Sequence, residues 1–246
     1  MGSGMTVCWQ WGSGLAQGVR HRQDGLPCQD RVLAMPVGDQ GVVLAAIDGA
    51  GSASHAEAGA EVVQWALECC AERTEVCSAQ MLESWIYAAN AALNLRAQEL
   101  QVPGQALACT VVVSALGPWG MCAAQVGDGV AIYDDGNGWR PLTWPMNGAY
   151  ANETWFVDGE SLEGRLMVLS RTEQPLRAMV MSDGLVQLAL RYATQEAYAP
   201  FLDPVWSIIT GPGGPHRGLH RVLHARQIQA ATDDDLSIAV AWRTGD

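Results

Sequence analysis

The first part of the chain carries three short apolar stretches with the patterns of strands. Met5–Trp11 alternates, so that its odd-numbered residues share one face, and Val32–Met35 is short and apolar. Val42–Ile47 is an uninterrupted apolar run, which is typical of a strand buried on both faces. We therefore expect the chain to begin with strands that enter a sheet.

Apolar residues then recur at helical spacing in two longer segments. Ser54 to about Arg73 predicts a helix for which Ser54 would be the N-cap, and Gln80–Leu100 predicts a second helix that Pro103-Gly104 stops. The expected apolar stripes comprise Val62, Trp65, Ala66, Cys69 and Cys70 in the first helix, and Leu82, Ile86, Ala89 and Leu93 in the second.

Short strands separated by turn residues follow the two helices. Gly-Pro, Gly-Asp-Gly and Asp-Asp-Gly-Asn-Gly lie between the first four of them, which predicts an antiparallel meander. Residues 143–164 have weak periodicity and are interpreted as a long loop or flap. The expected strands are 108–116, 120–126, 130–134, 138–142, 166–170, 178–182 and 238–242, with helical material at 195–209 and 216–224.

Runs of strands and runs of helices, rather than strict alternation, predict an α+β fold with antiparallel sheets. The 246 residues show no internal repeat or linker, so we expect a single domain over 1–246. Residues 1–4, MGSG, resemble a cloning remnant. The N-terminus lacks the basic start and apolar core of a signal peptide, and no apolar run reaches the roughly 20 residues that span a bilayer.

Composition and charge exclude several classes of function. Hydrophobic residues make up 49% of the chain, which is ample for a core, and the net charge of −12 argues against nucleic acid or an anionic membrane as partner. All 14 basic residues are Arg, so enzymes that need a P-loop, Schiff-base or kinase lysine are excluded. The seven cysteines contain no C-x-x-C pair and favour a reducing, cytoplasmic location.

Aspartates lie just beyond several of the apolar runs. Asp30 follows GLPCQ, Asp48 follows VVLAAI, Asp128 follows CAAQVG and Asp183 follows AMVMS, while DDD at 233–235 precedes the last strand. One Asp-Gly at a strand end is most often a turn. If all these strand ends meet at one edge, however, their carboxylates would repel one another unless cations bind between them. Oxygen ligands alone favour Mg²⁺ or Mn²⁺.

The order QD, DGAGS, GDG, SDG and DDLS resembles the metal-dependent serine/threonine protein phosphatases of type 2C, and GVRHRQDGLPCQD is similar to a bacterial subgroup of that family. The similarity spans residues 21 to 240. It implies a four-layer αββα sandwich of two antiparallel sheets flanked by helices. It also implies hydrolysis of phosphoserine and phosphothreonine, by in-line attack of a hydroxide that bridges two metal ions.

The resemblance also implies a metal set of two or three Mn²⁺ or Mg²⁺ ions. By position, Asp48 would bridge two ions, and the Gly49 carbonyl would bind one of them. Asp183 and Asp234 would complete the second site, and Asp128 would help Asp183 to bind a third, weaker ion.

Other motif positions would support the reaction. Asp30 would hold the metal-bound waters or a metal from the opposite side, which makes it catalytic together with Asp48. Gln29 replaces a Glu that the family usually carries, and Gln29 and Asp235 are expected just behind the ligands. Asp233 has no counterpart in the motif and is expected in solvent.

This sequence departs from the family pattern at two positions. Gly25 stands where the family usually has a phosphate-binding Arg, and Ala50 where many members have a His. His21, Arg20 and Arg22 are the candidate replacements for the missing cation. His21 is favoured, with a catalytic and substrate-binding role, although a structural turn histidine is about as plausible. Arg22 and Asn152, the latter in the flap, are the other candidate substrate-binding residues.

Two alternatives stay open at this point. VVLAAIDGAGSAS approaches a nucleotide-binding fingerprint, but its Asp would repel a pyrophosphate, and two helices follow where a βαβ unit is needed. A non-catalytic module that binds phosphopeptides on the same fold would explain the missing Arg. The expected partners are a phosphorylated protein substrate and a cognate serine/threonine kinase.

Overall fold

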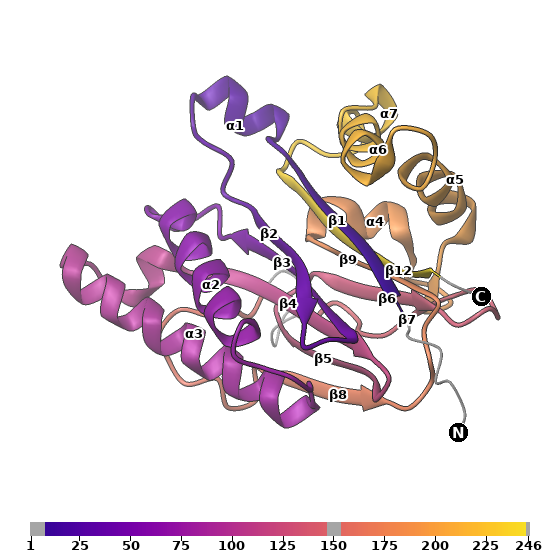
Figure 1. The fold of residues 1–246 in the computed structure, drawn as a ribbon. Coiled ribbons are helices and arrows are strands. Elements are labelled where there is room, and N and C mark those ends of the chain that lie inside the picture. The colour runs from indigo at the N-terminus through magenta and orange to yellow at the C-terminus, as the bar shows by residue number, and fades with distance from the viewer. Residues whose placement is uncertain (1–7, 147–153, 245–246) are drawn as a thin grey trace.

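Two antiparallel sheets form the centre of the protein (Figure 1), for which a computed structural model describes residues 8–146 and 154–244. The first sheet has the order β1-β12-β9-β6-β7, and the second has the order β2-β3-β4-β5-β8. Their bounds are β1 Cys8–Ala16, β2 Arg31–Val37, β3 Gly41–Gly49, β4 Cys109–Gly117, β5 Gly120–Val126, β6 Val130–Asp134, β7 Trp139–Pro141, β8 Met167–Arg171, β9 Arg177–Met181 and β12 Leu236–Thr244.

Strand β3 is buried on both faces, which explains its uninterrupted apolar sequence. Val43, Ala45 and Ile47 pack against helices, and the alternate residues Val42 and Leu44 pack against the facing sheet. Because successive side chains of a strand point to opposite faces, a strand between two layers must be apolar on both. The core therefore has three apolar layers, one between the sheets and one under each group of helices.

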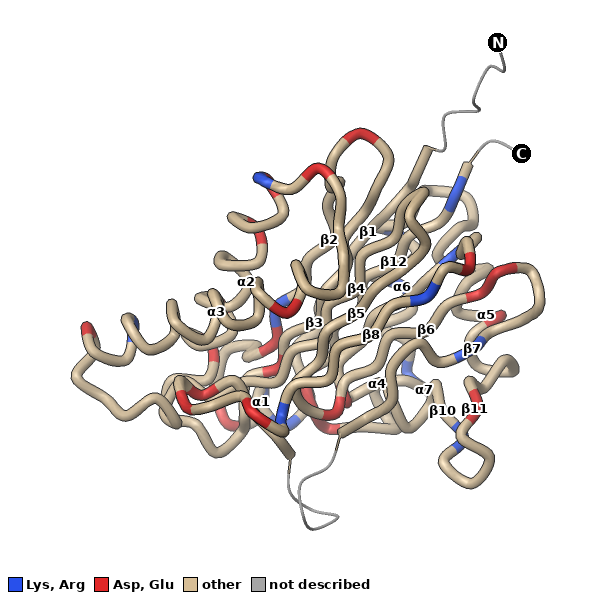
Figure 2. The backbone as a smooth tube through the Cα atoms, turned by 90° about the horizontal axis from the view of Figure 1, so that it is seen from below, with Lys and Arg blue, Asp and Glu red and all other residues tan. Residues whose placement is uncertain are grey.

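Helices cover the outer face of each sheet (Figures 1 and 2). Helices α2 (Ala56–Ala71) and α3 (Ala79–Leu100) lie on the second sheet, while α4 (Asp183–Ala189), α5 (Ala199–Ile209) and α6 (Gly214–Leu223) lie over the first. This arrangement confirms the predicted αββα sandwich. The shorter elements are α1 Val19–Asp24, the 3₁₀ helix η1 Gly104–Leu107, α7 Arg226–Gln229 and the two-stranded ribbon of β10 Leu190–Arg191 with β11 Glu196–Ala197.

The predicted four-strand meander is wrong. β4 pairs with β5 in one sheet, but β6 and β7 belong to the other, so the chain crosses between sheets at Gly127–Gly129. Gly127 has φ of +102°, which L side chains rarely adopt, and a Cβ there would lie 2.5 Å from Thr110. The same turn residues occur in a hairpin and in this crossing. The local sequence therefore does not show that the strands on either side pair with different partners.

Three local predictions for the helices also need correction. His55, not Ser54, is the N-cap of α2, and Ser54 Oγ lies 2.9 Å from His55 Nδ1 instead of capping the helix. Trp65 is 61% exposed, because the buried stripe of α2 runs through Val63 and Leu67. The helix expected from residue 195 starts at Ala199. Within the described residues, the structure contains no helix long and apolar enough to cross a membrane.

Candidate metal centre

Four strand-end aspartates meet where the two sheets end. Asp48 lies near the end of β3, Asp128 in the crossing from β5 to β6, Asp183 at the start of α4, and Asp234 in the turn before β12. Carboxylate oxygens of Asp48, Asp128 and Asp183 all lie within 4.8 Å of one another. Residues 135 positions apart in the chain thus share one site.

These acids line a small cavity of about 150 Å³. Within the described part of the chain, its lining contains no Lys, Arg or His, so no protein cation neutralises the carboxylates there. The lining residues are Asp48, Gly49, Ala50, Gly51, Thr110, Asp128, Thr154, Phe156, Asp183 and Asp234.

Burial and mutual repulsion disturb the titration of these acids. Burial raises the pKa of the Asp30 carboxyl to about 7, and the charge of Asp235 adds to the shift. Burial, followed by the charges of Asp128 and Asp234, raises the pKa of Asp183 to about 8. The pKa of Asp48 lies well above its ordinary value, because its carboxylate is surrounded by protein and faces Asp30.

The donor set fits hard divalent cations. All its side-chain donors are carboxylate oxygens, which Mg²⁺ and Mn²⁺ prefer. Among the described residues, the buried atoms Asp30 Oδ2 and Asp128 Oδ1 have no hydrogen-bond partner. A buried polar atom without a partner costs free energy, and a cation bound at each of these oxygens would remove that cost.

Small residues after Asp48 allow helix α2 to approach the site. A Cβ on Gly49 would lie 2.9 Å from Ala56 at the start of α2, so only glycine fits this contact. A Cβ on Gly51 would meet nothing within 4 Å, and Gly51 lines the cavity. The stretch AAIDGAGS thus combines close packing on one side with open space on the other.

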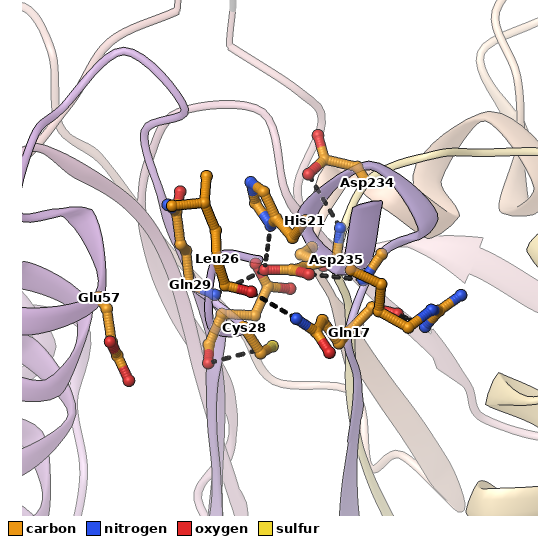
Figure 3. Close-up of polar contacts among 12 residues, drawn as sticks. Gln17, His21, Leu26, Cys28, Gln29, Glu57, Asp234 and Asp235 are labelled. Atoms are coloured by element: carbon orange, nitrogen blue, oxygen red, sulfur yellow. Dashed lines mark hydrogen bonds and ion pairs between the residues drawn. The ribbon is translucent and has the colours of Figure 1, made fainter. Parts of the chain in front are cut away.

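Asp235 holds the segment from Gly18 to Gln29 beside the cavity, as Figure 3 shows. Its Oδ1 accepts the backbone N–H of Gly18 at 2.6 Å, and its Oδ2 accepts the N–H of Gln29 at 2.6 Å. The same Oδ2 lies 2.9 Å from His21 Nδ1, and both side chains are buried. Asp235 therefore fixes helix α1 and the approach to Asp30 rather than lining the cavity.

Neither His21 nor Arg22, the two cationic residues predicted to bind substrate, lines the cavity. His21 is buried against Asp235, which is the contact of a structural histidine. Arg22 is exposed, donates to Gln229 Oε1 at 2.7 Å and lines a different hollow. Asn152, the third predicted substrate-binding residue, lies outside the described residues. Asp233 is exposed, as expected.

The described part of the predicted flap reaches the site through Thr154 and Phe156. Thr154 Oγ1 donates to Asp128 Oδ2 at 2.8 Å, and Phe156 also lines the cavity. Thr110 lines the cavity from β4 and was not predicted, because its only signal in the sequence is a polar residue in an apolar strand. The flap and β4 therefore complete the wall around the four acids.

Comparison with known proteins tests the resemblance directly. A family model described as Protein phosphatase 2C matches residues 17–224. The chain belongs to the protein phosphatase 2C family. It is 29% identical over 243 residues to serine/threonine-protein phosphatase 3 of Escherichia coli (strain K12), and this match covers 91% of this chain and 94% of that protein.

Solved structures show the same phosphatase 2C fold. The catalytic domain of the serine/threonine phosphatase PstP, solved with two manganese ions, aligns with a TM-score of 0.71 and 16% identity over 98% of this chain and 100% of that one. RsbX, solved with magnesium, gives 0.62 and 15% identity over 96% of each chain. Stp1 of Staphylococcus aureus gives 0.68 and 16% identity over the full length of both. At these identities the likeness establishes the fold alone.

Proposed function

We propose that this phosphatase 2C chain hydrolyses phosphoserine and phosphothreonine in protein substrates with Mn²⁺ or Mg²⁺. The observation that carries the proposal is the convergence of the carboxylates of Asp48, Asp128 and Asp183 in one cavity that no basic side chain lines, within the described residues. Family membership supplies the reaction class, and the cavity supplies a donor set that fits the metals.

Asp48, Asp183 and Asp234 would hold two ions together with the Gly49 carbonyl, and Asp128 with Asp183 would hold a third. Bound divalent cations supply Lewis-acid chemistry, since they lower the pKa of water and neutralise charge on phosphoryl oxygens.

The remaining residues prepare the site. Asp30 Oδ2 is buried and unpartnered among the described residues, so it can accept a proton during hydrolysis. Thr154 donates a hydrogen bond to Asp128 Oδ2, so that Asp128 Oδ1 is free to bind a cation. Asp235 orients the backbone before Asp30 through Gly18 and Gln29. His21 would act as a positioning residue through Asp235.

The proposal is tested with p-nitrophenyl phosphate and with phosphoserine peptides, with Mn²⁺ and with EDTA. We expect activity to need the metal and Asp48→Asn to lower kcat by about a thousandfold or more, because it removes the central ligand. Asp39→Asn is the matched control, since Asp39 is exposed in the turn between β2 and β3. Activity that survives EDTA and Asp48→Asn contradicts the metal mechanism.

The second candidate function is a non-catalytic module that binds phosphopeptides. Gly25, which stands where the family usually has an Arg, and the lack of a basic side chain among the described cavity residues favour it. It predicts Mn²⁺ binding by calorimetry and phosphopeptide binding without hydrolysis of any phosphorylated substrate.

A further inference from the structure

Helices α6 and α7 lie in a part of the chain that contains no acid. Residues 204–232 include three Arg and three His but no Asp or Glu, although the chain carries 26 acids and a net charge of −12. Helix α6 buries Leu219, Val222 and Leu223 and exposes Arg217 and Arg221 on its other side. An ordinary solvent-exposed face carries both acidic and basic side chains. A face that carries basic side chains alone therefore indicates a role beyond solubility.

Two surface hollows concentrate these side chains, and no carboxylate lines either of them within the described residues. The first measures about 530 Å³ and is lined by Pro212, His216, Arg217, His220 and Arg221. The second measures about 560 Å³ and is lined by Gln17, Val19, Arg22, His224, Arg226 and Gln229. We call Arg22, Arg217, Arg221, Arg226, His216, His220 and His224 the basic face.

The arginines of the basic face are free to bind an anion. Across residues 8–146 and 154–244, ion pairs hold Arg31, Arg96, Arg140, Arg165 and Arg177, whereas none of the four arginines of the basic face lies within 4.0 Å of a carboxylate. Their hydrogen bonds go to neutral oxygens, such as Gln229 Oε1 for Arg22 and the Ile208 carbonyl for Arg221. Their charges are therefore not neutralised by the described protein.

The basic face adjoins the turn that carries Asp234 of the metal centre. Arg22 of α1 bonds Gln229 of α7, and the backbone N–H of Arg20 donates to the Asp233 carbonyl at 3.0 Å. Asp234, the next residue, lines the acidic cavity. Helices α1, α6 and α7 lie at the same end of the molecule (Figure 1), so an extended peptide can contact both regions.

We propose that the basic face docks acidic residues of the phosphoprotein substrate, at positions away from the phosphorylated residue. The inference rests on the proposed function and adds a substrate class to it, namely phosphoproteins with a cluster of Asp, Glu or further phosphates beside the target. A short acidic segment fits better than nucleic acid, because the net charge of −12 repels a long polyanion whereas screening over about 8 Å isolates a local contact.

The first test compares three substrates: p-nitrophenyl phosphate, a phosphoserine peptide with neutral flanks, and the same peptide with four Glu on one side. We expect Arg217→Glu/Arg221→Glu to lower kcat/KM about tenfold for the acidic peptide and to leave the other two substrates unchanged, with the difference shrinking at high salt. Arg73→Glu/Arg171→Glu is the matched control, since both residues are exposed and lack an ion pair within the described residues. Equal loss in both double variants, or no loss in either, overturns the proposal.

The second test measures binding without catalysis. A fluorescent, unphosphorylated Glu-rich peptide is titrated with the full chain in Mn²⁺ and followed by anisotropy. We expect binding that Arg217→Glu/Arg221→Glu weakens and the control variant does not. This result would support the docking surface even if the chain hydrolysed no substrate. The docking proposal and the proposed phosphatase activity can therefore be refuted independently. Tighter binding of single-stranded DNA of equal charge would overturn the acidic-peptide assignment.

Discussion

The acidic cavity should make the metal-free protein less stable as the pH rises. Asp30 has a folded pKa of about 7, against an ordinary value of 3.8, because it is buried. Between these values the folded protein holds a proton that the unfolded chain has released, so raising the pH removes stability from the folded state. The window opens near pH 4 and extends to about pH 8 for Asp183, whose burial and acidic neighbours raise its pKa further.

The size of the effect follows from the shift. Each pH unit within the window costs about 1.4 kcal/mol for one group, and less close to the folded pKa, so from pH 5 to pH 7 Asp30 alone costs about 2 kcal/mol. For a chain of this length, that corresponds to a fall in Tm of about 4–8 °C. Mn²⁺ should reverse the trend, because cations favour the ionised carboxylates and bind better as protons leave.

The assay is thermal unfolding followed by circular dichroism in EDTA and in Mn²⁺ at pH 5, 6 and 7. Asp48→Asn should flatten the pH dependence in EDTA, because it removes a carboxyl whose own pKa is raised by burial and by the charge of Asp30, and it should also lower the gain from Mn²⁺. Asp39→Asn should behave like the wild type, since Asp39 is exposed. A Tm in EDTA that is constant or rises from pH 5 to pH 7 would refute the reasoning.

Three further substitutions test separate contacts. Ser78→Ala should cost about 1 kcal/mol in urea unfolding, because Ser78 caps α3, and Ser78→Asn should restore most of it. Gly59→Ala should cost more than about 2 kcal/mol, since its Cβ would meet the backbone of Leu107; a mild effect in the same unfolding experiment would show that α2 can shift. Thr154→Val should raise the Mn²⁺ concentration for half-maximal activity a few-fold, because Asp128 loses its hydrogen bond, while Thr154→Ser should not.

Most of the strand pattern was readable from the sequence. The bounds predicted for β5 and β6, Gly120–Val126 and Val130–Asp134, agree with the structure, because runs of apolar residues between turn residues leave few other choices. Helices α1 and α4 were missed, since six or seven residues are too few to show helical periodicity. Asp183 was expected just beyond a strand, and the structure shows that it also begins α4.

The sequence by itself determined which residues are apolar on one face or both, where the chain turns, and the order of the acidic motifs that match the family. Those properties depend on neighbours within a few positions, or on motif order along the chain. Only the tertiary structure decided that β5 and β6 lie in different sheets, which carries Asp128 to the acids of β3 and α4. Likewise, it placed His21 against Asp235 and Arg22 beside Gln229. Long-range pairing sets such contacts, and local periodicity carries no information about the partner.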